Sequence, residues 1–135
     1  MTQPKTVLDA SALLAFLLQE PGAEAVATAL MDHCAISALN YAETLSKLSD
    51  HGQDVDQAAD RMRRQGLTGA ALTVFPVDES QAREMARLRR ETRRAGLSLA
   101  DRGCLALAMS LNLPALTADL SWVSLKLGIE VQPIR

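Results

Sequence analysis

Short apolar runs typical of β-strands alternate with longer helical patterns along almost the whole chain, and this alternation most constrains the fold. Strands are expected at residues 6–8, 34–36, 71–74, 114–117 and 129–134. Helices are expected at 11–18, then after Pro21-Gly22 to about residue 31, and at 38–48, 54–65, 78–94, 98–111 and 119–127. Such alternation favours an α/β fold with a central, mainly parallel sheet of four to five strands flanked by helices. Because the strands are short and apolar, we expect burial on both faces of the sheet.

The size of the chain and its polarity indicate one globular domain spanning residues 1–135. Hydrophobic residues make up 48% and charged residues 22%, which is not the composition of a disordered chain. The longest unbroken apolar run, from Ala12 to Leu18, is too short to cross a bilayer. The segment from Met1 to Lys5 has no signal-peptide pattern. We therefore expect a cytoplasmic protein with no membrane partner.

Several common kinds of site are excluded by the residues that the sequence lacks. Cys34 and Cys104 lie in apolar surroundings with no CxxC motif, so we expect two buried thiols rather than a disulfide or a zinc site. The only histidines, His33 and His51, exclude a site built on several histidines and an HExxH motif. The seven glycines form neither GxGxxG nor GxxxxGK[ST], so the usual nucleotide-binding loops are absent.

Charge is distributed unevenly along the chain, although the net charge is only −2. Residues 1–60 contain nine acids and two bases, whereas residues 61–102 contain ten bases, all arginine, and five acids. Arginine suits phosphate because its planar guanidinium donates two hydrogen bonds at once. A solvated helix face would produce the same pattern, and charge alone leaves both interpretations open.

Four acidic residues are expected near the carboxyl ends of the strands, where open parallel sheets bind their ligands. Asp9 follows the first strand, Glu43 lies one turn into the helix after the second, Asp101 lies in the first turn of the helix beginning at Ser98, and Asp119 follows the fourth strand. We expect no lysine or histidine at an equivalent position. Neighbouring carboxylates repel each other unless a cation lies among them. Oxygen ligands of this kind select Mg²⁺ or Mn²⁺, which activate water in phosphoryl chemistry.

Each of these acids also has a simpler structural interpretation. Asp9 and Asp119 could cap the helices that follow them, and residues 98–101 (SLAD) match a capping box. Glu43 could be an exposed residue beside an apolar helical stripe. The pattern alone leaves these alternatives open.

Four sequence motifs resemble those of PIN-domain nucleases. They are residues 7–15 (VLDASALLA), 37–43 (SALNYAE), 97–108 (LSLADRGCLALA) and 114–119 (PALTAD). Their order, their spacing and the total chain length are similar to those of the VapC toxins of bacterial toxin–antitoxin pairs. The resemblance covers essentially the whole chain.

The resemblance implies a PIN fold and metal-dependent hydrolysis of RNA, with products that carry a 5′-phosphate and a 3′-hydroxyl. Four acids would be catalytic and would bind Mg²⁺ or Mn²⁺, with the first and third as direct ligands: Asp9, Glu43, Asp101 and Asp119. Three polar residues would support the site, although local capping and turn hydrogen bonds explain them equally well: Ser11, Asn40 and Thr117.

The resemblance also implies partners: an RNA substrate, a cognate antitoxin that covers the active site, a second copy of the chain in a homodimer, and DNA only indirectly through the antitoxin. The arginine-rich helix would then follow the RNA backbone with Arg87, Arg90 and Arg94, at positions i, i+3 and i+7 of one face.

Two other classes of protein are alternatives to the nuclease. A receiver-like domain would have paired acids after its first strand and a lysine after its fifth. This chain has one acid in Leu8-Asp9-Ala10 and no lysine between Lys47 and Lys126, which disfavours that class. A non-catalytic PIN-fold module that binds RNA or protein is the remaining alternative, and the complete set of four acids argues against it.

Overall fold

One five-stranded sheet forms the centre of the protein in a computed structural model that describes residues 3–135. The strands are β1 (Thr6–Leu8), β2 (Cys34–Ser37), β3 (Leu72–Phe75), β4 (Ala115–Thr117) and β5 (Val131–Pro133). Their order is β3-β2-β1-β4-β5, and every neighbouring pair is parallel. The α/β class and the parallel sheet predicted from the sequence are confirmed. Met1 and Thr2, which begin the segment without a signal-peptide pattern, lie outside the described residues.

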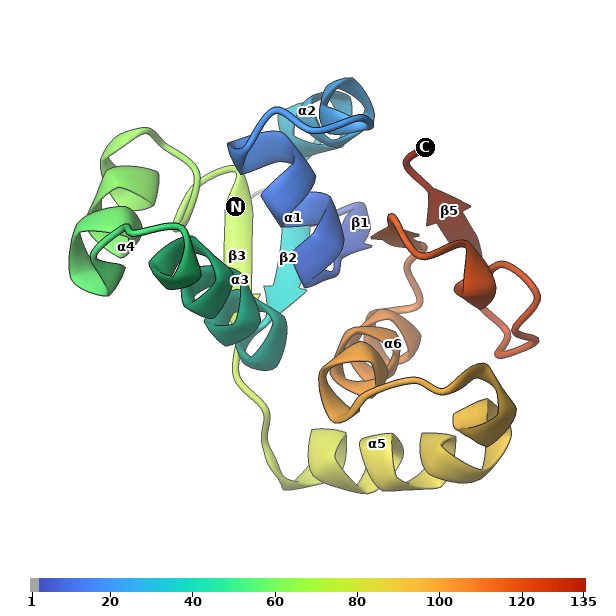
Figure 1. The fold of residues 1–135 in the computed structure, drawn as a ribbon. Coiled ribbons are helices and arrows are strands. Elements are labelled where there is room, and N and C mark those ends of the chain that lie inside the picture. Colours follow the sequence, from blue (N-terminus) through green and yellow to red (C-terminus); the bar gives the residue numbers. More distant parts are fainter. Residues whose placement is uncertain (1–2) are drawn as a thin grey trace.

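Helices cover both faces of this sheet (Figure 1). They are α1 (Ala10–Leu17), α2 (Ala23–Met31), α3 (Ala38–Asp50), α4 (Val55–Arg64), α5 (Glu79–Thr92) and α6 (Leu99–Leu111), with 3₁₀ turns η1 (Arg93–Ala95) and η2 (Leu120–Trp122). The helices α1 to α4 pack on one face and α5 with α6 on the other. Within residues 3–135, no helix is both long and apolar enough to span a membrane.

Alternating side chains of the central strands build two separate cores. On β1, Leu8 faces the core shared with α1 to α4, and Val7 faces the core shared with α5 and α6. Every residue of β1, β2 and β4 is buried, so the expected burial on both faces is confirmed for the three central strands. The edge strands β3 and β5 are only partly buried. The two cysteines, Cys34 and Cys104, are buried free thiols in opposite cores, as predicted.

The predicted helix at 119–127 is wrong, because only the turn η2 forms there. Ser121 and Ser124 are poor helix formers, since their hydroxyls compete for backbone hydrogen bonds. The apolar side chains also do not share one helical face: Trp122 is completely buried, whereas its neighbour Val123 is 51% exposed. Gly128, with φ +80°, then turns the chain toward β5.

The predicted helix at 78–94 also ends early, because α5 stops at Thr92 and η1 follows it. The buried Thr92 hydroxyl donates a 2.7 Å hydrogen bond to the carbonyl oxygen of Leu88. Such hydroxyl bonds back to the preceding turn often bend a helix. Gly96, with φ +69°, then ends the segment before α6.

The strand order fixes where a ligand site can form. Strand β1 pairs with β2 on one side and with β4 on the other. The chain adds β2 and β3 on one side of β1, and then β4 and β5 on the other side, so the order in which strands are added reverses between β1 and β4. The crevice at the carboxyl ends of such a strand pair is where open α/β sheets bind ligands. Asp9 follows β1 there directly, and Asp119 follows β4 two residues after its end.

Candidate functional site

A pocket of about 180 Å³ opens at the carboxyl ends of β1 and β4. Its walls come from the start of α1, the middle of α3, the first turn of α6 and the segment after β4. The lining residues are Asp9, Ala10, Ser11, Leu14, Glu43, Lys47, Asp101 and Asp119. The topology therefore brings the four acids selected from the sequence into one pocket, while their roles as metal ligands and catalytic groups stay predictions.

Asp9 lies deepest in this pocket and is only 4% exposed. Its carboxylate caps α1 by accepting a 2.8 Å hydrogen bond from the Ala12 N–H. The Ser11 hydroxyl lies 2.7 and 2.9 Å from the two carboxylate oxygens, and the Thr117 hydroxyl donates at 2.6 Å. The carboxylate is thus held in one orientation by groups from α1 and β4.

Burial raises the pKa of Asp9 to about 6, from 3.8. The hydrogen bonds from Thr117, Ala12 and Ser11 lower this pKa but do not offset the loss of hydration, and the charge of Asp101 raises it further. A buried carboxylate with a raised pKa and no cationic partner within 4.0 Å among residues 3–135 is an environment that a bound cation would stabilise.

Ser11 and Thr117 connect the two strand ends through their hydroxyls. The Ser11 Oγ accepts a 2.9 Å hydrogen bond from the Ala118 N–H, and the Thr117 Oγ1 accepts one of 3.0 Å from the Asp119 N–H. Both hydroxyls also contact the Asp9 carboxylate. Local turn bonding and support of the pocket, which the sequence left as alternatives, therefore occur together in the same two residues.

Asp101 and Asn40 position the start of α6. The Ser98 N–H donates to Asp101 Oδ2 at 2.9 Å, and the Asp101 N–H donates to Ser98 Oγ at 3.1 Å, which completes a capping box. The completely buried Asn40 donates from Nδ2 to the Ala100 carbonyl oxygen at 3.0 Å, so α3 is tied to the first turn of α6. Asn40 thus fixes the backbone beside Asp101 rather than lining the pocket itself.

Glu43 projects from α3 and is half-buried. Burial and the neighbouring charge of Asp101 raise its pKa, and the ammonium of Lys47 opposes that rise. Lys47 lies one helical turn after Glu43 and lines the same pocket. The expectation that no lysine would lie beside the acids is therefore wrong. The signal that could have identified Lys47 is its spacing of four residues from Glu43, because residues at i and i+4 of a helix lie on the same face.

Asp119 lies at the exposed rim and caps the turn η2. Its Oδ1 accepts hydrogen bonds from the N–H and the hydroxyl of Ser121, at 2.9 and 2.7 Å. The capping interpretations of Asp9, Asp101 and Asp119 are thus all confirmed. They do not exclude metal binding, because each carboxylate offers about four lone-pair positions and capping occupies only some of them.

The donor set suits a hard divalent cation, although the carboxylates are not drawn into a tight cluster. Within residues 3–135, no three His, Cys, Asp or Glu side chains stand close enough together to hold a metal ion as they are placed. Asp101 and Asp119 each accept a hydrogen bond from a neighbouring backbone N–H, and mutual repulsion keeps carboxylates apart unless a cation lies among them. The four acids from four elements supply oxygen ligands only, which fits Mg²⁺ or Mn²⁺ better than zinc.

The arginine-rich segment has two kinds of arginine. Arg87 and Arg90 are exposed on α5, and Arg87 is paired with Glu84 at 2.6 Å. Arg94 lies beyond α5 in η1, so the predicted single helical face with Arg87 and Arg90 is wrong. Arg102 is buried and donates to the Met85 carbonyl oxygen at 3.0 Å, which ties α6 to α5 and removes this arginine from any phosphate-binding surface.

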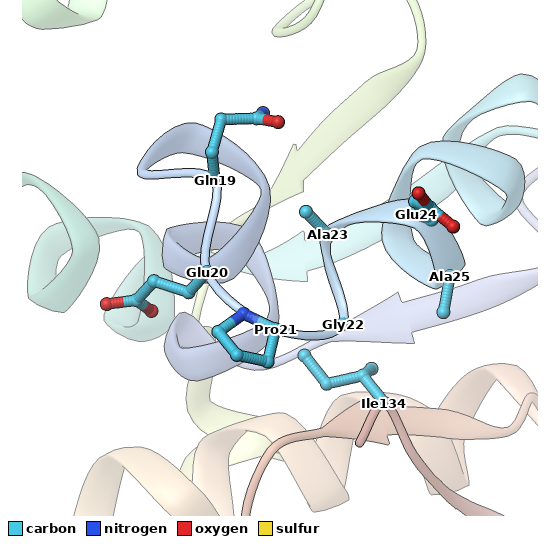
Figure 2. A pocket seen from close by; sticks show the side chains of 8 residues that line it. All are labelled: Gln19, Glu20, Pro21, Gly22, Ala23, Glu24, Ala25 and Ile134. Carbon is cyan, nitrogen blue, oxygen red and sulfur yellow. The ribbon is translucent and has the colours of Figure 1, made fainter.

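Two pockets of more than twice the volume of the acidic pocket lie away from the four acids. One of about 590 Å³ is formed by residues 19–25 and Ile134, and Figure 2 shows Glu20 pointing away from Ile134. Gly22, with φ +100°, brings this turn so close that a Cβ there would lie 2.8 Å from the Ile134 carbonyl oxygen. The other, of about 510 Å³, is mainly apolar and is bordered by α1, α2 and the segment after α4. Neither has the cluster of chemically reactive groups found in the acidic pocket.

Comparisons with known proteins agree with this fold. Residues 6–126 match the sequence model of the family described as PIN domain. A chain of a toxin–antitoxin complex from Klebsiella pneumoniae is 19% identical with a TM-score of 0.74, over 97% of this chain and 98% of that one. A chain of DNA-bound VapBC from Salmonella typhimurium is 15% identical with a TM-score of 0.70, over 98% and 100%. VapBC-5 from Mycobacterium tuberculosis has a chain that is 26% identical with a TM-score of 0.54, over 98% and 99%. No curated protein matches the sequence significantly.

Proposed function

Because this chain belongs to the PIN domain family, we propose that it is a metal-dependent ribonuclease that hydrolyses RNA phosphodiester bonds. The observation that carries the proposal is the single pocket lined by Asp9, Glu43, Asp101 and Asp119 at the reversal point of the sheet. Four carboxylates with one neighbouring ammonium would be poorly suited to an anionic substrate unless a divalent cation joined them.

In this proposal, Asp9 and Asp101 bind Mg²⁺ or Mn²⁺ directly. Glu43 and Asp119 bind it directly or through water, or orient the attacking water. The bound cation supplies an activated water and neutralises charge on the phosphate. Ser11 and Thr117 hold the Asp9 carboxylate in its orientation, and Asn40 holds the α6 backbone beside Asp101.

We further propose that the chain is the toxin of a type II toxin–antitoxin pair of the VapBC kind, inhibited by a cognate antitoxin and active as a homodimer in the cytoplasm. The support is the similarity in fold, over nearly the full length of both chains, to chains of complexes described as toxin–antitoxin and VapBC. In this arrangement DNA is contacted only through the antitoxin.

The exposed arginines are proposed to contact the RNA backbone outside the pocket. Arg90 and Arg94 are exposed, and η1 leads directly into the first turn of α6, where Asp101 lies. Arg87 contributes less, because Glu84 already neutralises part of its charge. Replacing all three arginines by alanine would reduce the salt dependence of RNA binding, with a slope smaller by about 0.7 for each lost phosphate contact on single strands.

One observation favours a second function, a non-catalytic PIN-fold module that binds RNA or protein. The acids of the described residues are not gathered tightly enough to hold a metal ion as they stand. Under this alternative the carboxylates serve as helix caps, and RNA or protein binds without being cut.

The two functions are separated by incubating antitoxin-free protein with total cellular RNA in Mg²⁺, Mn²⁺ or EDTA. Asp101→Asn removes one pocket charge, and Asp54→Asn is the control, because Asp54 also accepts a backbone N–H at a helix start, as the N-cap of α4, but lies outside the pocket. Metal-dependent fragments from the wild type and the control, absent with Asp101→Asn, support the nuclease. Intact RNA in every lane, with folded protein, supports the binding module. Cleavage that persists in Asp101→Asn would show that the site assignment is wrong.

A further inference from the structure

Lys47 is the basic side chain among the eight residues that line the acidic pocket. It lies on α3 one turn after Glu43, so its stem runs along the same helical face toward the pocket. The side chain is exposed at the pocket wall, which leaves its ammonium accessible to a ligand. The pocket is therefore not uniformly acidic, because one cation borders four carboxylates.

This ammonium is not already neutralised by an acid. The ion pairs within residues 3–135 are Arg83–Glu79 and Arg87–Glu84, both on α5. Lys47 has no carboxylate within 4.0 Å in that part of the chain, even though Glu43 is on the next turn. An unpaired ammonium next to a group of acids is available to an incoming anion.

An RNA phosphate that enters this pocket approaches four negative side chains. A divalent cation reduces the repulsion but does not remove it, since four carboxylates carry more charge than one such ion. A lysine is suited to the remaining task, because its compact ammonium has three donors that rotate freely toward phosphate oxygens.

We propose that Lys47 binds an RNA phosphate at the acidic pocket and thereby positions the phosphodiester against the carboxylate-bound metal. This inference rests on the proposed ribonuclease function and adds a substrate-binding residue to it. It assigns to α3 two tasks on adjacent turns: Glu43 acts on the metal side of the pocket, and Lys47 on the substrate side.

The test measures RNA binding separately from cleavage. A fluorescein-labelled single-stranded oligoribonucleotide, carrying a cleavage sequence mapped with the wild type, is titrated by anisotropy in Mg²⁺. All proteins in this binding series carry Asp101→Asn, so that the probe stays intact. Lys47→Gln is compared with Lys47→Arg, which keeps the charge. Lys5→Gln is the matched control, because Lys5 is exposed at the amino end of β1, the opposite edge of the sheet from the pocket.

The expected result is that Lys47→Gln weakens RNA binding about tenfold, as for loss of a hydrogen bond to a charged group. The slope of log affinity against log salt is expected to fall by about 0.7, the value for one phosphate contact on a single strand. Lys47→Arg should retain most of the affinity, and Lys5→Gln should match the parent. In the wild-type background, Lys47→Gln should raise KM more than it lowers kcat.

Two results would overturn the inference. One is an unchanged affinity and salt slope in Lys47→Gln. The other is a lower kcat with unchanged RNA binding, which would mean that Lys47 acts only on the charge of Glu43. Titration of Mn²⁺ into the wild type and into Lys47→Gln, both with Asp101 intact, checks that the pocket is intact, and Lys47→Gln should not weaken that binding. Failure of the ribonuclease proposal looks different, because the wild type itself would then leave RNA uncut.

Discussion

Replacing Asp9 by asparagine is expected to stabilise the metal-free protein at neutral pH while it abolishes RNA cleavage. The folded protein holds this carboxyl almost out of water, and its pKa rises from 3.8 to about 6 because of burial. The folded state therefore binds a proton more tightly than the unfolded chain does. Stability contributed by that proton is present below about pH 4 and is lost as the pH rises to about 6.

The size of this effect follows from the two pKa values. At 1.36 kcal/mol for each tenfold change in proton affinity, the ionised carboxylate destabilises the fold by up to about 3 kcal/mol above pH 6. Asparagine has no charge and can still accept the N–H of Ala12 through its side-chain oxygen. We therefore expect Asp9→Asn to raise the free energy of unfolding by about 1–3 kcal/mol at pH 7.5, and to raise it less at pH 4.

Urea unfolding in EDTA across pH 4–8 measures this difference, with Asp60→Asn as the control. Asp60 is exposed on α4, and its side chain makes no hydrogen bond among residues 3–135. The reasoning is refuted if Asp9→Asn is less stable than the wild type at pH 7.5, or if their difference does not grow between pH 4 and 6. Adding Mn²⁺ should stabilise the wild type and not the variant, because only the wild type binds the ion in the folded state.

The remaining predictions concern groups that support the pocket. Gly103→Val should lower the free energy of unfolding by about 1–3 kcal/mol and reduce RNA cleavage, because even a Cβ at Gly103 would lie only 3.1 Å from Leu39 Cδ1, between the two helices that carry Asp101 and Glu43. Gly103→Ala should be much milder in the same urea titration. Arg102→Gln should lower stability by about 1–3 kcal/mol, measured by urea unfolding, since it removes the donor to the α5 backbone. Thr117→Val should raise the pKa of Asp9 further, because it removes a hydrogen bond that lowers this pKa, so the acidic limb of the pH–rate profile should move to higher pH.

Elements with a strong hydrophobic pattern were predicted well because burial decides them. The strands β1, β2 and β4 are mainly apolar, with one hydroxyl residue at an end of each, and all of their residues are buried. The segment after Asp119 has as many apolar residues, yet it forms only η2. Its side chains alternate between burial and exposure as the chain turns toward β5, so the tertiary path rather than local propensity decides its structure.

The four acids of the pocket could be predicted from the sequence, but its lysine, Lys47, could not. Asp9 and Asp119 follow strands whose parallel pairing was inferred from the alternation of elements, so their meeting followed from topology. Lys47 follows no strand, and its place in the pocket depends on how α3 is rotated about its axis. That rotation is set by packing, including the hydrogen bond from Asn40 to the Ala100 carbonyl oxygen. The sequence also could not separate the exposed arginines from the buried one. Arg102 belongs to the arginine-rich segment, but in the fold it is buried and donates a hydrogen bond to the backbone of α5.

Three of the four acids cap a helix or turn and also line the pocket, and one physical cause accounts for both. The N-terminus of a helix presents backbone N–H groups that attract a carboxylate. The starts of α1 and η2 follow the carboxyl ends of β1 and β4, whereas the start of α6 follows η1 and is tied to α3 by the hydrogen bond from Asn40 to the Ala100 carbonyl oxygen. Capping therefore holds Asp9 and Asp119 where the sheet reverses direction, and it holds Asp101 at the helix start that packs beside them. Each cap bond fixes one carboxylate through backbone contacts that persist without a metal ion. A bound cation would then need to draw in only oxygens that are already held in the pocket, which reduces the conformational entropy lost on binding.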